Sequence, residues 1–342
     1  LLVALYTTDP REASLTLEGA APETHAIRLS ARGLSRRRPD TCTFPPLRVE
    51  FAAEPPAGSL FRGQRRLKLV THCRRDPGFQ RHILLEYAAY RLLNALTPLS
   101  FRVRLAEISY AEPGGAAPAA PRWGFFIEDV DDLARRNGLV EIDTPGVAVA
   151  RLARRAAARF ALFQYMIGNF DWAMHAGPPG AGCCHNSRLL GAAPGAADGL
   201  VPVPYDFDHS GLVDAPYAVV PQPVPVASVR TRRYRGFCVH NGEASAAAAE
   251  ARAARPALLA AIENVPGLDP RDRRRAAAYL AGFFDDVATA ESLERALLRW
   301  LFFDERDKDE ICRELNVDRN HLRVLVHRAK ARFRQRFEEA SE

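Results

Sequence analysis

Residues 203–211 read VPYDFDHSG, and this stretch decides how the fold of the whole chain is interpreted. An apolar run ends at Pro204, and Asp206 and Asp208 follow it with one residue between them. Because side chains two residues apart in an extended segment point to the same side, both carboxylates at a strand end would face one way and could chelate a metal ion. The alternative is a turn in which the two aspartates cap backbone amides.

A second polar group lies upstream of this stretch. Residues 167–172 read IGNFDW at the end of an apolar helical segment, and His185-Asn186 follows after a loop rich in Gly and Pro. If Asp171 and Asn186 converge on one point, they supply oxygen ligands for Mg²⁺ and an acceptor for the proton of a substrate hydroxyl. Each residue alone also fits an ordinary surface loop.

Further upstream, a lysine interrupts an apolar strand. Residues 66–70 read RLKLV, so Lys68 points away from the face that carries its two leucine neighbours. The chain has two other lysines, Lys308 and Lys330, and arginine supplies the remaining basic residues. The Lys68 ammonium either reaches solvent along the strand surface or enters a cleft, where it could hold phosphate oxygens.

The order of expected elements is strands first and helices second. Apolar spacing predicts a helix near 78–96 that contains Glu86, a residue that either orients a buried lysine or lies on the surface. Period-2 alternation predicts strands at 15–18, 27–30, 47–51, 66–70, 101–105 and 123–127. Further helices are expected at 147–170, 244–265 and 270–287. This order predicts an α+β fold with two lobes.

Composition excludes several classes of protein. Of 342 residues, 47% are hydrophobic and 26% charged, which indicates a folded chain of two or three domains rather than a disordered one. The net charge of +6 is spread along the chain and says little about nucleic acid. No apolar run is long enough for a membrane-spanning helix, and the first residues lack the features of a signal peptide.

The six cysteines do not form a metal-binding motif. They are Cys42, Cys73, Cys183, Cys184, Cys238 and Cys312. Without a C-x-x-C pair, a zinc site is not expected. Cys42 and Cys73 flank strands that we expect to be neighbours, so a disulfide in an oxidising compartment and two free thiols are both open.

Taken in order, these features resemble the CotH-type kinase-like proteins, known from spore coats and secreted relatives. The resemblance covers roughly residues 10–287. It rests on the segments ARG (31–33), CTFPPL (42–47), LKLVTHC (67–73), FIEDV (126–130), GNFDW (168–172), HN (185–186) and YDFDHSG (205–211). It implies a divergent two-lobed protein-kinase fold, with an N-lobe of about 1–130 and a C-lobe of about 131–287, that transfers phosphate from ATP to Ser or Thr of a protein.

The resemblance also implies roles for individual residues. Lys68 would bind the ATP phosphates, with Glu86 as its partner on the helix. Asp171 would be the catalytic-loop carboxylate, and Glu128 would lie at the lobe junction near the adenine.

The same resemblance implies a Mg²⁺ site made by Asp206 and Asp208, with Asn186 nearby as a ligand of metal or cofactor. Two departures from the family pattern leave an inactive scaffold or another nucleotide chemistry as alternatives. Trp172 follows Asp171 where better-studied members continue Asp-Arg-His, and no G-x-G-x-x-G loop covers the phosphates.

Residues 291–337 have the layout of a separate helix-turn-helix module. We expect a short helix over 309–315, a turn at 316–317, and a longer helix that Asp318 N-caps. Basic and polar side chains on the second helix would meet DNA, near base edges at its start and at phosphates further along: Arg319, Asn320, Arg323, Arg328 and Lys330. The alternative is a solvated charged face of a coiled coil.

The run from residue 306 to residue 333 resembles region 4 of bacterial extracytoplasmic-function sigma factors. That resemblance implies recognition of the promoter −35 element, contact with RNA polymerase, and a cytoplasmic location, whereas CotH-like relatives are often exported to the periplasm or beyond. We find no region 2, so a complete sigma factor is not expected. Three interpretations stay open: a phosphotransferase with a DNA-binding module, a DNA-binding protein with an inactive scaffold, or two parts joined artificially.

Overall fold

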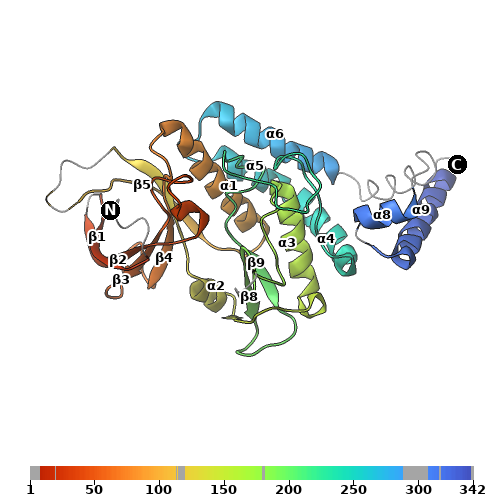
Figure 1. The fold of residues 1–342 in the computed structure, drawn as a ribbon, viewed down its shortest axis with the longest axis horizontal. Coiled ribbons are helices and arrows are strands. Elements are labelled where there is room, and N and C mark those ends of the chain that lie inside the picture. The colour runs from red at the N-terminus through yellow and green to blue at the C-terminus, as the bar shows by residue number, and fades with distance from the viewer. Residues whose placement is uncertain are drawn as a thin grey trace.

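The computed structural model describes residues 8–19, 21–112, 114, 120–178, 182–287, 307–315 and 317–339. The chain forms a mixed α+β fold, as expected (Figure 1). A large antiparallel sheet is formed by the N-terminal part of the chain, and most of the helices follow it in the sequence. Within these ranges, no helix combines the length and apolar character that crossing a membrane requires.

The large sheet has six antiparallel strands in the order β1-β2-β3-β4-β6-β5. They are β1 (Arg11–Leu17), β2 (Glu23–Ala31), β3 (Leu47–Phe51), β4 (Arg66–Val70), β5 (Val103–Ile108) and β6 (Arg122–Ile127). All six expected strands are confirmed. Lys68 on β4 lies opposite Ile127 on β6, while Leu67 and Leu69 are buried, so the alternation holds at this strand.

Helix α1 (Gln80–Leu96) packs against β5 and β6 and joins the sheet to the rest of the protein. Its buried positions include Ala88, Ala89 and Leu92, and they belong to a core that also contains residues from beyond β9. Glu86 is on this helix and is buried, so its expected position in a helix is confirmed and its surface alternative is wrong.

The second half consists of a small sheet and five helices among the described residues. The elements are α2 (Val130–Arg136), β7 (Val140–Glu141), α3 (Arg154–Ile167), β8 (Ser187–Gly191), β9 (Val201–Pro204), α4 (Asn241–Ala253), α5 (Arg255–Glu263) and α6 (Pro270–Asp286). Helix α2 was not expected, and α3 is shorter than 147–170 because Gly168, at φ 65°, ends it in a left-handed cap.

One expected helix proves to be two. The segment 244–265 divides at Ala254 into α4 and α5. Pro256 lies in the first turn of α5, where it needs no helical N–H donor, but it cannot continue the preceding helix.

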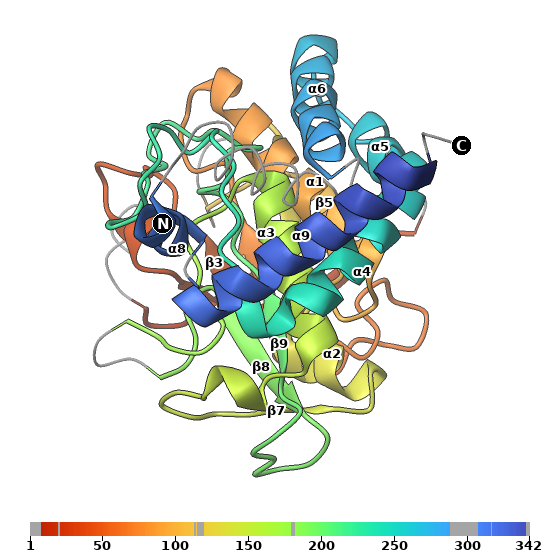
Figure 2. The ribbon, with the colours of Figure 1, turned by 90° about the vertical axis from the view of Figure 1, so that its right-hand side faces the viewer.

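The C-terminal helices are α8 (Lys308–Leu315) and α9 (Arg319–Glu339). Ile311, Cys312 and Leu322 form their small core, and the amide of His321 donates to the Asp318 carboxylate at 2.7 Å, which confirms the expected N-cap. In Figure 2, α9 crosses the view in front of α3 and α4. The first part of the expected module, residues 291–306, lies outside the described residues.

Candidate functional site

Lys68 lies beside two aromatic rings and two positively charged side chains. Its Nζ lies 4.5 Å from the centre of the Tyr205 ring and 5.2 Å from that of Phe101. Burial, together with the charges of Arg32 and Arg188, lowers the pKa of Lys68 to about 7. Lys68 is half-buried, so it is not a fully solvated surface lysine.

The two arginines beside Lys68 have unused donors. Arg32 follows β2 and Arg188 is on β8, so the three cations come from three different elements. The buried Nε atoms of Arg32 and Arg188 have no hydrogen-bond partner among the described residues. Buried donors are normally satisfied, so this cluster has the charge and the free hydrogen bonds to bind an anion.

A buried arginine organises the acidic residues of the site. Arg36, in the short 3-10 helix η2 (Ser35–Arg37), binds Glu86 at 2.6 Å and Asp208 at 2.8 Å, and its Nη2 lies 3.9 Å from an oxygen of Asp206. The pair of Glu86 with Lys68, which the family resemblance implies, is absent from the described ion pairs. Oε2 of Glu86 binds Arg36 instead, and its buried Oε1 has no hydrogen-bond partner among the described residues. Sequence reasoning missed Arg36, which nothing distinguishes from the many other arginines.

The Arg36 guanidinium lies within 4 Å of three carboxylates, and the pKa values of these carboxyl groups shift in different directions. Burial and the neighbouring aspartates raise the pKa of Glu86 to about 8. Burial and Asp208 also raise the pKa of Asp206. Although burial opposes it, the charge of Arg36 holds the pKa of Asp208 below its usual range, and the Tyr217 hydroxyl donates to the same carboxylate at 2.9 Å.

The two aspartates of the YDFDHSG stretch therefore differ in availability. Asp208 is buried, and its Oδ2 accepts hydrogen bonds from both Arg36 and Tyr217. The side chain of Asp206 is 34% exposed, and its amide donates to the hydroxyl of Tyr90 on α1 at 2.9 Å. Asp206 is therefore the more exposed of the two, while Asp208 ties the segment to Arg36 and Tyr217.

Asp171 is held by the two residues that sequence reasoning grouped with it. Its Oδ1 contacts Nε2 of His185 at 2.6 Å, and its Oδ2 accepts from the side-chain amide of Asn186 at 2.9 Å. The hydrogen bond with Asp171 raises the pKa of His185. The expected convergence of Asp171 and Asn186 is thus present, with Asn186 oriented by the carboxylate.

Glu128 lies directly after β6, where the chain leaves the large sheet. Its Oε1 accepts from the amide of Arg102 at 2.6 Å and from the Arg136 guanidinium at 2.7 Å. The carboxylate therefore ties the strand end to α2.

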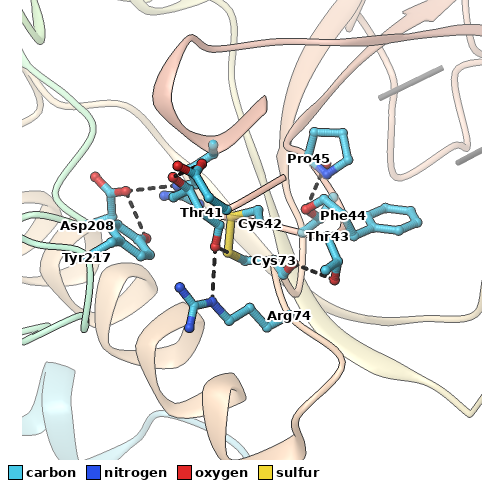
Figure 3. Close-up of a disulfide and its surroundings, with 12 residues drawn as sticks. Thr41, Cys42, Thr43, Phe44, Pro45, Cys73, Arg74, Asp208 and Tyr217 are labelled. Carbon is cyan, nitrogen blue, oxygen red and sulfur yellow. Dashed lines mark hydrogen bonds and ion pairs between the residues drawn. A yellow bond between two sulfur atoms is a disulfide. The ribbon is translucent and has the colours of Figure 1, made fainter. Parts of the chain in front are cut away.

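A disulfide anchors the loop that carries Arg36. Cys42 is bonded to Cys73, just beyond β4, and the backbone carbonyl of Thr41 accepts from Nε of Arg74 at 3.0 Å (Figure 3). Tyr217 packs against this disulfide and also donates to Asp208, so the loop, the disulfide and the acidic cluster form one connected unit. A second disulfide, which was not expected, joins the adjacent Cys183 and Cys184.

The carboxylates do not form a complete metal site by themselves. Across the described ranges, no group of three or more His, Cys, Asp or Glu residues is placed to hold a metal ion. Asp206 together with the amide oxygen of Asn186 offers hard ligands, and Mg²⁺ commonly binds one or two protein oxygens plus substrate phosphates. These donors therefore fit a Mg²⁺ ion by type, provided that further ligands come from outside the protein.

Comparisons with family models, with curated proteins and with solved structures found no match to this chain. The chemistry of the site must accordingly be inferred from its own residues.

The candidate DNA-binding residues on α9 are not equivalent. Both Nε and Nη2 of Arg319 donate to the carboxylate of Asp309 on α8, so its guanidinium is already paired. Asn320, Arg323 and Lys330 are exposed, and the side chain of Arg328 lies outside the described residues. Asn320 and Arg323 are thus better placed than Arg319 to reach a base edge.

Proposed function

We propose that the part of the chain up to α6 is a CotH-like, ATP-dependent phosphotransferase with a protein hydroxyl as acceptor. The observation that carries this proposal is the convergence of Lys68, Arg32 and Arg188, with unused donors, beside the half-exposed carboxylate of Asp206. A polyphosphate with a bound divalent cation matches this arrangement, because the three basic side chains can bind phosphate oxygens and the carboxylate can bind the cation.

The topology supports the same proposal. Without β1, the large sheet has the order β2-β3-β4-β6-β5, and Lys68 lies on the third of these strands along the chain. Helix α1 follows that strand and carries a buried glutamate. Protein kinases place their phosphate-binding lysine and helical glutamate in this way. The chain departs from them because Arg36 takes the glutamate.

Each residue then has a distinct task. Lys68 and the two arginines would bind phosphate oxygens, and Asp206 with Asn186 would hold Mg²⁺, which offsets phosphate charge when bound. Asp171 would orient the acceptor hydroxyl and take its proton, while His185 and Asn186 hold the carboxylate in place. Arg36 would fix Glu86 and Asp208.

Binding of nucleotide is expected to be coupled to proton uptake. With a pKa of about 7, Lys68 is mostly neutral at pH 8, and bound phosphates would restore its ammonium form. We expect Mg²⁺ with a non-hydrolysable ATP analogue to take up approaching ~1 proton per site at pH 8 and much less at pH 6. Calorimetric titrations in two buffers of different ionisation enthalpy measure this uptake.

Lys68→Met is the matched variant for that measurement, and it should abolish the buffer dependence. Buffer-independent heats at pH 8 would show that Lys68 does not meet the phosphates. Absence of any nucleotide binding by the wild-type chain would overturn the proposed function itself.

A second proposal concerns the C-terminal helix pair. We propose that α8 and α9 form a sigma region 4-like module that binds promoter DNA, supported by the capped start of α9 and the exposed Asn320 and Arg323 beside it. Recognition in the major groove uses side chains at such a helix start. RNA polymerase is the partner that this proposal implies.

Arg323→Ala is expected to weaken binding of the full chain to a −35-type duplex by about 10- to 100-fold, as loss of a base contact would. Arg319→Ala is the control, with a smaller effect because Asp309 already pairs that guanidinium. Fluorescence anisotropy at several salt concentrations measures both. A wild-type chain with no salt-dependent affinity for duplex DNA would refute this second proposal.

A further inference from the structure

A segment rich in arginine runs between β9 and α4 and touches two distant parts of the chain. We call residues 230–238 the arginine strap; it contains Arg230, Arg232, Arg233 and Arg235. One set of its contacts involves the segment around Asp171, and the other involves the end of α8. Neither set uses Lys68, Asp206 or the other residues assigned to ligand binding.

On one side, the arginine strap holds the residues that flank Asp171. Nη1 of Arg235 donates to the carbonyl of Phe170 at 2.6 Å, and its guanidinium lies 5.1 Å from the centre of the Trp172 ring. Nε of Arg232 donates to the carbonyl of Met166 at 3.1 Å. Arg235 thereby fixes the residues before and after Asp171.

On the other side, the arginine strap caps α8. Nη2 of Arg233 donates to the carbonyl of Glu314 at 3.1 Å, and the thiol of Cys238 donates to that of Leu315 at 3.7 Å. The last carbonyls of a helix lack intrahelical partners and carry the negative end of its dipole, so a cation stabilises this position. These carbonyls belong to the last two residues of α8.

From these contacts we infer that Arg235 is a positioning residue for Asp171, and that the arginine strap couples this position to the docking of α8. Release of α8 would free Arg233 and Cys238, and Arg235 is only two residues from Arg233. The segment around Asp171 would then lose part of its support. The coupling between α8 and the segment around Asp171 does not depend on the proposed phosphotransferase function. The effect of this coupling on turnover does rest on that function.

The test compares substitutions at the two ends of the arginine strap in the full chain. Arg233→Ala is expected to speed amide hydrogen exchange at residues 169–172 and to lower kcat about 3- to 30-fold, with the KM for ATP unchanged. Arg235→Ala should lower kcat by about 10²-fold, since small displacements of a catalytic group are costly, and Arg235→Lys should recover part of that loss. Arg313→Ala, on the exposed side of α8, is the control and should change neither measurement.

The double variant distinguishes coupling from two separate defects. If the arginine strap acts as one unit, Arg233→Ala has little further effect once Arg235 is replaced, so the two effects are not additive. Fully additive effects, or unchanged exchange at 169–172 in Arg233→Ala, would overturn the inference. Changed exchange in a chain that shows no turnover would instead refute the proposed function and leave the coupling intact.

Discussion

Lys68→Met and Asp206→Asn should each lower Mg²⁺-dependent ATP turnover, or autophosphorylation, of the full chain by at least about 10³-fold. Lys68 is the cation with the lowered pKa at the centre of the proposed phosphate site, and Asp206 is the carboxylate of its segment that is free to take a metal ion. Radiolabelled phosphate transfer measures both variants with the same assay.

The fold should survive the lysine substitution. Burial disfavours the charged form of Lys68, so Met, of similar length, removes a cost and should leave the melting temperature unchanged or higher. The control for loss of a lysine is Lys308→Met, at the exposed start of α8. The control for loss of a carboxylate is Asp40→Asn, whose ion pair with Arg38 is exposed. Turnover that persists in both site variants would show that the reaction occurs elsewhere.

The largest loss of stability is expected for Arg36→Met. Removing this guanidinium leaves Glu86 and Asp208 buried without their cation, and breaking a buried ion pair costs about 3–5 kcal/mol. Urea unfolding at pH 8 measures the loss. The neighbouring Arg38→Met, whose ion pair with Asp40 is exposed, should cost about 1 kcal/mol or less.

The pH dependence of the Arg36→Met defect gives an independent check. In the variant, burial without a cation raises the pKa of both carboxyl groups, that of Glu86 from an already raised value and that of Asp208 from a lowered one. The folded state then binds more protons than the unfolded state between about pH 4.5 and pH 8. Stability of the variant should then fall as pH rises through this range, and its deficit should be smaller at pH 5 than at pH 8. A deficit that does not change with pH would mean that the acidic cluster is not responsible.

Local patterns in the sequence account for much of the fold. The alternation of residues 66–70 placed Lys68 opposite the face of its leucines, and apolar spacing placed Glu86 on a helix, because both depend only on near neighbours in the chain. The break between α4 and α5 was missed, since apolar spacing continues across Pro256.

The site was less accessible from the sequence because its key contacts are distant in the chain. Arg36 binds Glu86 from 50 residues away and Asp208 from 172 residues away. Nothing in the spacing of Asp206 and Asp208 shows that Arg36 and Tyr217 bind Asp208 while Asp206 stays more exposed. The grouping of Asp171 with His185 and Asn186 fared better, because a loop that returns close to its start brings them together.

The low pKa of Lys68 has a consequence for chemical labelling. At pH 8 this amine is largely uncharged and therefore nucleophilic. An acylating reagent that reaches the site beside Arg32 and Arg188 would react with the Lys68 amine. A bound phosphate would protect this amine by restoring its charge. The other two lysines lie on the C-terminal helices. The extent of covalent modification of Lys68 would thus report, in the intact chain, whether an anion is bound beside this lysine.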